Sequence, residues 1–224
     1  MKTLVFAMLT LLLILGPTSG RGASPGRVKT KENLDPLRET LALIQTTKLV
    51  KFDLEKTVAL ELMGTEKVYN GSCFLSGNLF RFDIQGPDKS LVLYDGHTLW
   101  VVQYPDKAFG GPIQVSRGKL QGKQKEQLVL TELLTKGRLL ESFNVKQTSD
   151  KDGVLSYEAL PKNKKFNLKS VQLKIKGHEL KALDYVDDIG NKTSLKILNE
   201  KLSASAKPEL FHYKPEKGAQ VTDL

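Results

Sequence analysis

Residues 50–62, VKFDLEKTVALEL, alternate between apolar and polar side chains over an unusual length. The large apolar side chains share one parity: Val50, Phe52, Leu54, Val58, Leu60 and Leu62. Because successive side chains of a strand point to opposite faces, this pattern predicts a strand with one apolar and one polar face. At about 3.3 Å per residue it could span roughly 43 Å, whereas ordinary strands have about 5–6 residues. The fold must therefore cover an unusually long apolar face.

Similar alternation dominates the rest of the chain. It predicts strands at about 66–76, 79–85, 90–94, 97–103, 141–148, 153–160, 168–176, 179–186 and 193–201, with a last short strand at 210–213. Tight turns such as Asp95-Gly96 join neighbouring segments, which favours antiparallel hairpins over βαβ crossovers. Several Gly and Pro residues within 105–125 predict a loop.

Two short helices complete the predicted elements. The first begins at Asp35-Pro36, with Asp35 as N-cap, and ends near Thr47, while the second covers 126–136 and stops at Gly137. Helices of about 11–14 residues are roughly 16–21 Å long, too short to cover a sheet of this size. The sheet is therefore expected to curl into a barrel or half-barrel with the helices as plug or lid. From periodicity alone, a filled sandwich core is favoured over an apolar cavity.

The N-terminus has the layout of a secretory signal peptide. A positive start precedes an apolar run over 4–15, and small or helix-breaking residues follow. The run is shorter than the ~20 residues that a membrane-spanning helix needs, although an uncleaved anchor is the alternative. We predict a signal peptide over 1–23, a flexible leader over 24–33 and one domain over 34–224. No cysteine follows the run, so the chain is not expected to be a lipoprotein itself.

The charge and the single cysteine exclude some classes of function. The formal net charge is +9, but the lysines are scattered and usually fall on the polar parity of strands, which indicates solvated faces rather than a nucleic-acid site. Cys73 cannot form an internal disulfide, and we interpret it as a small core residue rather than a reactive thiol.

Motifs for catalysis or metal binding are missing from the sequence. His97, His178 and His212 have no second ligand at metal-binding spacing. The segment 150–153 (DKDG) lacks the remaining ligands of a calcium loop and predicts a hairpin turn instead. The chain has no nucleophile elbow, P-loop or dinucleotide fingerprint. We therefore predict no catalytic residue, no metal site and no cofactor.

Two segments carry a family resemblance. Residues 78–100 (NLFRFDIQGPDKSLVLYDGHTLW) contain an N-L-F-x-aromatic stretch, then Pro-Asp, then D-G-x-x-L-W. Residues 211–221 (FHYKPEKGAQV) are similar to an F-x-F-x-P-P-x-G-V-x-V ending. In this order, and with comparable turns at 157–161 and 187–193, the chain resembles the outer-membrane lipoprotein carrier family (LolA) over about 34–224.

The resemblance implies both a fold and a function. The expected fold is mainly β with two short helices: an open half-barrel of about eleven antiparallel strands with a helical lid over an apolar cavity. The expected function is that of a monomeric, soluble periplasmic chaperone for lipoproteins. It would accept their acyl chains from an inner-membrane ABC-type transporter and pass them to an outer-membrane acceptor. The acceptor is itself a lipoprotein, so the missing lipid-anchor cysteine favours the carrier.

Seven apolar side chains are expected to line the cavity of such a carrier: Phe52, Leu54, Leu60, Phe80, Phe82, Ile84 and Trp100. One departure from the family concerns the lid. Relatives of the best-known carrier have Arg-Pro just before N-L-F, and that Arg holds the empty cavity closed. Here the pair is Ser76-Gly77, so the resemblance implies a lid that closes differently or more weakly.

Three alternatives stay open at this point. The same fold could carry another lipid or glycolipid, or sense mislocalised lipoproteins. The chain could be an exported enzyme without a recognisable motif. It could also be a structural envelope protein whose core is filled.

Overall fold

The computed structural model describes residues 33–86, 89–106, 108, 110–119, 139–163 and 167–223, all within one compact unit, Glu32–Leu224. The strands are β1 (Leu49–Leu60), β2 (Thr65–Ser76), β3 (Leu79–Gln85), β4 (Ser90–Tyr94), β5 (Leu99–Gln103), β6 (Gln114–Gly118), β7 (Phe143–Lys151), β8 (Val154–Pro161), β9 (Leu168–Lys176), β10 (Glu179–Asp187), β11 (Lys192–Ser203) and β12 (Gln220–Asp223). The helices are α1 (Asp35–Thr46), α4 (Leu139–Ser142) and the 3-10 helix η2 (Pro208–Phe211). The predicted signal peptide, nearly all of the leader and the predicted helix at 126–136 lie outside the described residues.

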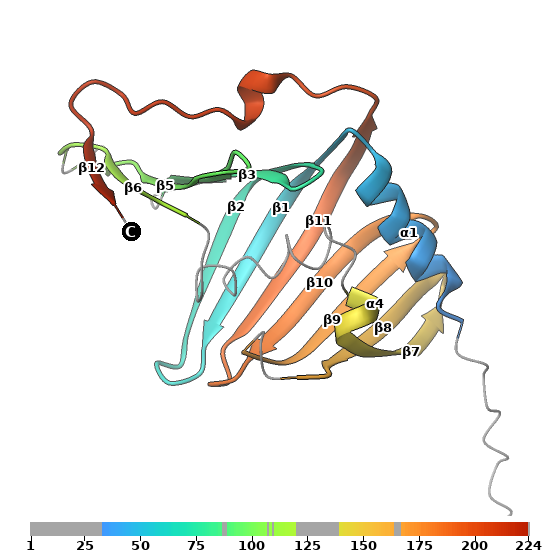
Figure 1. Ribbon diagram of the computed structural model, residues 1–224. Helices are drawn as coiled ribbons and strands as arrows, with labels where there is room; N and C mark the ends of the chain where they lie inside the picture. Colours follow the sequence, from blue (N-terminus) through green and yellow to red (C-terminus); the bar gives the residue numbers. More distant parts are fainter. Residues whose placement is uncertain are drawn as a thin grey trace, which may run out of the picture. The chain divides into compact units, whose positions relative to one another are not determined.

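All twelve strands form one open sheet in the order β12-β6-β5-β4-β3-β2-β1-β11-β10-β9-β8-β7. Strands β1 to β11 pair antiparallel throughout, and β12 joins the edge by pairing in parallel with β6. Figure 1 shows β3 to β6 running across the direction of β1, β2 and β8 to β11, so the sheet is strongly twisted and curved. The prediction of a mainly β, open and largely antiparallel fold with short helices is confirmed.

The long alternation at 50–62 becomes β1 and the start of its turn. β1 pairs with β2 over its whole apolar stretch, from Val50 opposite Leu75 to Leu60 opposite Thr65. On its other side it pairs with β11, with a register shift between Lys51 and Asp53. β1 is therefore a central strand of the sheet, and its apolar face is continued by neighbours on both sides.

The sequence prediction was wrong for β6 and for the C-terminal residues, which meet at one end of the sheet. Residues 114–118 form β6, although the sequence predicted a loop there. Val115 is their only large apolar side chain, so no alternation can be recognised in this segment. The predicted strand at 210–213 is replaced by η2, which has Pro208 in its first turn and buries Phe211. The tail instead pairs further on, as β12.

Two apolar clusters lie on opposite faces of the sheet. The inner face, defined as the one that carries α1 and α4, holds the larger cluster, which includes Leu37 and Leu41 of α1 together with Phe80, Tyr157 and Leu173 of the sheet. Figure 1 shows α1 lying across the β8–β10 part of the sheet. The outer face holds a smaller cluster on β4 to β6, against which residues of the C-terminal segment pack.

The start of α1 differs in one detail from the sequence prediction. The helix begins at Asp35 with Pro in its first turn, but Leu34 is the N-cap and offers no side-chain hydrogen bond. The Asn33 Oδ1 atom accepts the backbone N–H of Asp35 at 3.1 Å instead. Asp35 is thus an acidic first-turn residue, a favourable position beside the positive end of the helix dipole.

Candidate functional site

A small apolar hollow lies on the inner face near the middle of the sheet. Its volume is about 120 Å³, and it is lined by Leu54, Lys56, Tyr69, Asn70, Gly71, Ser72, Phe82, Asp83, Ile84, Val92, Tyr185 and Leu195. This volume is well below the roughly 300–1,000 Å³ of a typical ligand pocket. A long acyl chain would therefore have to lie along its open side or push the wall apart.

Gly71 is the reason that the wall is hollowed at this point. It lies between Leu54 on β1 and Ile84 on β3, both of which carry large apolar side chains. A Cβ atom on Gly71 would lie 2.2 Å from the carbonyl oxygen of Asp83, so no side chain fits. Close approach of β2 to β3 thus leaves a gap in an otherwise apolar surface.

The structure brings six of the seven predicted residues onto this inner face. The register places Phe52 and Phe82 on either side of Cys73, and Leu54 and Ile84 on either side of Gly71. Phe52 and Phe80 are 2% and 0% exposed and belong to the core, which they share with α1. Leu54, Phe82 and Ile84 are half-buried and line the hollow, while Leu60 is half-buried at the far end of β1.

The prediction that Trp100 lies on the same wall was wrong. The pairing of Tyr94 with Leu99 sets Trp100 on the outer face, where its ring centroid lies 5.4 Å from that of Tyr213. Its indole N–H donates to the Asp95 carboxylate at 3.0 Å. Residues 95–98 form a four-residue connection rather than a two-residue turn. Alternation shows which residues of one strand share a face. It does not show which face of the next strand continues it when the length of the connecting turn is unknown.

The structure confirms the prediction that Cys73 is a core residue. It is fully buried between Phe52 and Phe82, and burial raises the pKa of its thiol well above the usual range. A thiol held in its neutral form in an apolar wall is a poor nucleophile.

A second, larger hollow on the sheet continues from the first and has a different character. Its volume is about 620 Å³, and its lining is Lys56, Val58, Lys67, Tyr69, Ile84, Lys89, Ser90, Gln103, Tyr104 and Asp106. Lys56, Tyr69 and Ile84 line both hollows, so the two meet at these side chains. We call the first the apolar hollow and the second the basic hollow.

Lys56 is the functional candidate that sequence reasoning missed. It is half-buried on the apolar parity of β1, between Leu54 and Val58, and desolvation lowers the pKa of its ammonium group. The structure gives it no ion pair with any described residue. The break in the alternation of VKFDLEKTVALEL at this position is the observation that could have identified it.

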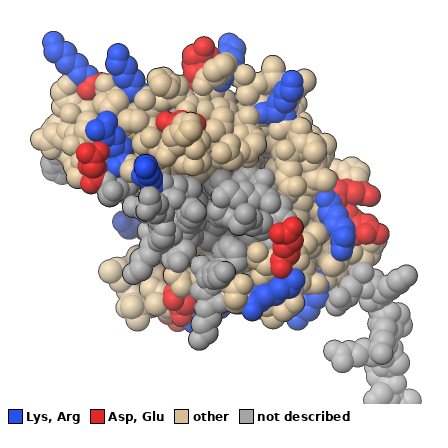
Figure 2. All heavy atoms as spheres, viewed as in Figure 1, with Lys and Arg blue, Asp and Glu red and all other residues tan. Residues whose placement is uncertain are grey.

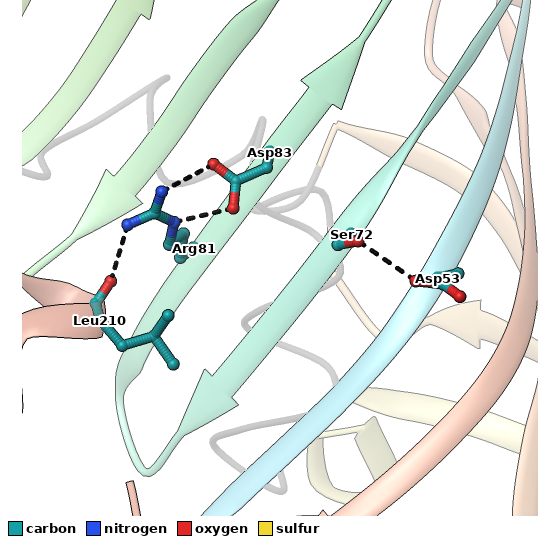
Figure 3. A network of polar contacts seen from close by, with 5 residues as sticks. All are labelled: Asp53, Ser72, Arg81, Asp83 and Leu210. Carbon is teal, nitrogen blue, oxygen red and sulfur yellow. Dashed lines mark hydrogen bonds and ion pairs between the residues drawn. The ribbon is translucent and has the colours of Figure 1, made fainter. Parts of the chain in front are cut away.

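Three charged groups on the outer face, Arg81, Asp83 and Asp53, have partners that are drawn in part in Figure 3. The Arg81 guanidinium donates to both carboxylate oxygens of Asp83, at 2.8 and 2.9 Å, and to the carbonyl oxygen of Leu210 at 3.1 Å. It thereby fastens η2 to β3. Asp53 accepts hydrogen bonds from Asn199 and Ser72, and these lower the pKa of its carboxyl group.

The Ser76-Gly77 pair lies in the hairpin between β2 and β3. Ser76 pairs directly with Leu79, and Gly77 takes φ +57, a left-handed conformation that proline cannot adopt. The family's Arg-Pro pair would therefore not fit this turn. Arg81, further along the same hairpin, contacts the C-terminal segment.

Lysines and acids are interspersed on the face of the molecule shown in Figure 2, rather than gathered by sign. This agrees with the expectation of solvated lysines along the strands. Among the described residues, no group of three or more His, Cys, Asp or Glu could hold a metal ion. No helix in the described part of the chain is long and apolar enough to cross a membrane.

Comparison with known proteins assigns the chain to a family. Residues 73–214 match the family model for the outer membrane lipoprotein carrier protein LolA. The outer-membrane lipoprotein carrier protein of Methylibium petroleiphilum is 25% identical over 191 residues, which cover 84% of this chain and 88% of that protein. That of Neisseria meningitidis serogroup C is 25% identical over 161 residues, covering 70% and 72%. Among solved structures, a LolA superfamily protein from Nitrosomonas europaea aligns with a TM-score of 0.43 at 12% identity, over 81% of this chain and 98% of that one. Since the family model spans well over half of the sequence, the chain belongs to the LolA family of outer membrane lipoprotein carrier proteins.

Proposed function

We propose that the protein is a periplasmic chaperone that binds the acyl chains of lipoproteins released from the inner membrane and carries them to the outer membrane. The predicted signal peptide over 1–23 would export it, leaving the domain over 34–224 as a monomeric carrier. An inner-membrane ABC-type transporter would supply the cargo, and an outer-membrane acceptor would take it over. The role requires neither catalysis nor a cofactor.

The observation that carries this proposal is the apolar hollow. Leu54, Phe82 and Ile84 continue the core of the inner face but are only half-buried around the gap at Gly71. A filled sandwich core would bury such side chains completely, since interiors pack without voids larger than a water molecule. A partly open apolar surface next to a rigid core is suited to a flexible hydrocarbon chain.

Energetics favour a surface that shields the chains only in part. Full burial of one sixteen-carbon chain yields roughly 12 kcal/mol at about 0.8 kcal/mol per methylene. Two or three fully buried chains would exceed the practical ceiling of about 18–21 kcal/mol for noncovalent affinity. A carrier that must release its cargo therefore gains from a shallow site, and the small volume of the apolar hollow fits this requirement.

Binding of a fluorescent triacylated lipopeptide tests the proposal, with Phe82→Glu as the variant. A carboxylate in the apolar hollow should weaken binding at least tenfold, because the chain would have to desolvate it. Phe74→Glu is the matched control, since Phe74 is also half-buried, on neighbouring β2, but faces outward under Lys51. A folded Phe82→Glu protein that binds as tightly as the unmodified one would remove the apolar hollow from the site.

The transport role itself needs a second assay. The protein should withdraw a lipoprotein from inner-membrane vesicles that contain the releasing transporter into the soluble fraction, and Phe82→Glu should reduce the yield. Failure of the unmodified protein in this assay, despite tight lipopeptide binding, would favour a same-fold module for another lipid.

A further inference from the structure

The three most exposed large apolar side chains of the described residues lie at one end of the sheet. Leu62 and Met63 belong to the turn between β1 and β2 and are 85% and 73% exposed. Ile189 belongs to the turn between β10 and β11 and is 59% exposed. We call these three residues the apolar tip. Single apolar side chains are common on protein surfaces, whereas a group of them often marks a contact with another molecule.

The two turns of the apolar tip are joined to each other. The Asn191 Oδ1 atom accepts the backbone N–H of Glu61 at 3.2 Å, while the Nδ2 atom of the same side chain donates to Asp187 Oδ2 at 2.8 Å. A Cβ atom on Gly190 would lie 3.3 Å from Cγ of Glu61, so the turns also pack closely. Figure 1 shows them side by side at the lower end of the sheet. The apolar tip is therefore one surface made by two hairpins.

Each turn has a backbone conformation that its apolar side chains do not determine. In the first turn the Leu60 carbonyl oxygen accepts two backbone N–H groups, at 3.2 and 3.0 Å, and Gly64 takes φ +58. In the second, Asp187 Oδ1 accepts the backbone N–H groups of Ile189 and Asn191 at 3.1 and 2.8 Å. Polar residues and glycine are the usual residues of such exposed turns. A contact with another molecule therefore explains the apolar side chains better than folding does.

A lipid bilayer fits the apolar tip better than a protein partner does. Three aliphatic side chains expose on the order of a few hundred Å², whereas a stable protein interface buries roughly 800 Å² on each partner. A bilayer requires no complementary shape, because apolar side chains enter the boundary between head groups and acyl chains. Two joined turns at one end of a sheet are able to touch such a flat surface together.

Charges of both signs flank the apolar tip, so an anionic lipid gains no advantage there. Glu61, Glu66 and Lys67 lie beside the first turn, and Asp188 and Lys192 beside the second. Attraction to a bilayer must come from the apolar side chains, which together have about twelve non-hydrogen atoms. A myristoyl chain of about fourteen carbons gives only marginal, reversible binding, with an association constant of about 10⁴ M⁻¹. Contact through the apolar tip should be no stronger than this and therefore brief.

We infer that the apolar tip is a membrane-contact site, through which the protein touches a lipid bilayer of no net charge without a protein receptor. Val58 and Leu60 follow Leu54 of the apolar hollow along the inner face of β1 towards the tip. The contact brings this end of the inner face to the bilayer. The inference goes beyond the proposed function and does not depend on it, because the contact requires no cargo.

Binding of the cargo-free protein to phosphatidylcholine vesicles tests the inference. At about 1–10 mM lipid the unmodified protein should sediment with the vesicles, and added salt or anionic lipid should not change the bound fraction. The double variant Leu62→Gln, Met63→Gln should bind at least tenfold more weakly, because two apolar side chains no longer enter the bilayer. Both residues are exposed and neither takes a positive φ, so glutamine preserves the turn.

Two control variants exclude other routes to the vesicle. Leu43→Gln removes a leucine of α1 that is 37% exposed, and it should leave vesicle binding unchanged. Phe82→Glu should also leave it unchanged, although this variant should no longer bind a fluorescent acyl probe, a labelled palmitate, in the apolar hollow. The two controls thus separate the apolar tip from exposed leucine in general and from the acyl-chain site.

Three results would overturn the inference and leave acyl-chain binding untouched. The unmodified protein would not sediment with vesicles, the folded double variant would sediment equally well, or binding would need anionic lipid and disappear in salt. Self-association of the unmodified protein that the double variant abolishes would assign the apolar tip to a second copy of the chain instead. Failure of the acyl probe to bind, with vesicle binding intact, would overturn the proposed function alone.

Discussion

At the scale of single residues, Lys56 and Gly71 give the inner face its chemistry. Each interrupts an otherwise apolar row, Lys56 by adding a charge and Gly71 by omitting a side chain. Neither stabilises the fold, since a desolvated ammonium group and an unfilled gap both cost free energy. Features that lower stability at one place in a well-packed sheet are typical of binding sites.

The first prediction concerns the stability cost of Lys56. Replacing it with Met removes the desolvated charge and keeps the length of the side chain, so Lys56→Met should be more stable than the unmodified protein by about 0.5–2 kcal/mol. Urea unfolding at neutral pH measures this difference, with Lys174→Met as a control that should change stability little.

The pH dependence of stability tests whether the charge of Lys56 causes this difference. In the folded state the pKa of Lys56 is lowered, so the unfolded chain holds its proton to higher pH. The stability penalty is therefore full at neutral pH and disappears as pH rises through the lowered pKa towards the unfolded value. The difference in the free energy of unfolding between Lys56→Met and the unmodified protein should therefore become smaller at alkaline pH. Lys67, Tyr69 and Tyr185, which line the same hollows, are present in both proteins, and their contributions cancel to first order.

Among the secondary-structure elements, sequence periodicity predicted most strands correctly, because most strands bury apolar side chains on one face only. The predicted ranges for 79–85, 90–94 and 168–176 agree with β3, β4 and β9. β6 and β12 were not predicted, because their own residues show no alternation of apolar and polar side chains. Val115 is the only fully buried residue of the two strands. The face of Trp100 was missed because alternation does not carry across an unknown turn.

A prediction at this scale concerns the attachment of η2. Arg81 is 27% exposed and joins Asp83 on its own strand to Leu210, which lies 129 residues further along the chain. In Arg81→Met the Leu210 carbonyl loses a charge-assisted hydrogen bond, worth about 1.5–3 kcal/mol. Amide hydrogen exchange at Leu210 and His212, which donate within η2, should accelerate more than tenfold.

The control for this experiment is Lys146→Met, which breaks the pair between Lys146, 53% exposed, and Glu158, on β7 and β8 at the other end of the sheet. Surface pairs of that kind contribute about 0–1 kcal/mol, so exchange in η2 should not change. Acyl-probe binding should be unaffected by both variants, because Arg81 faces away from the two hollows. Unaltered exchange in folded Arg81→Met would mean that apolar packing of Phe211 alone holds the segment.

At the scale of the whole molecule, the described part of the sheet has two faces with different tasks. The inner face combines the main core with the two hollows, whereas the outer face is covered over β4 to β6 by residues of the C-terminal segment. The period-two patterns predicted a single apolar interior, because such a pattern indicates that one face of a strand is buried but not which residues cover that face. The single tryptophan tests this division directly.

Trp100 should not report binding on the inner face. Its ring packs on Tyr213 and its N–H is held by Asp95, both on the outer side of β5, so palmitate should leave its emission unchanged. Phe82→Trp in a Trp100→Phe background moves the only indole to the apolar hollow, and its emission should shift to the blue when palmitate displaces water. Ile84→Trp in the same background serves if the larger ring at position 82 disturbs folding. The opposite result would be a blue shift of Trp100 emission with no change in the emission of a tryptophan at position 82 or 84. It would place the acyl chain between the sheet and the C-terminal segment, and would contradict the proposal that the chain binds on the inner face.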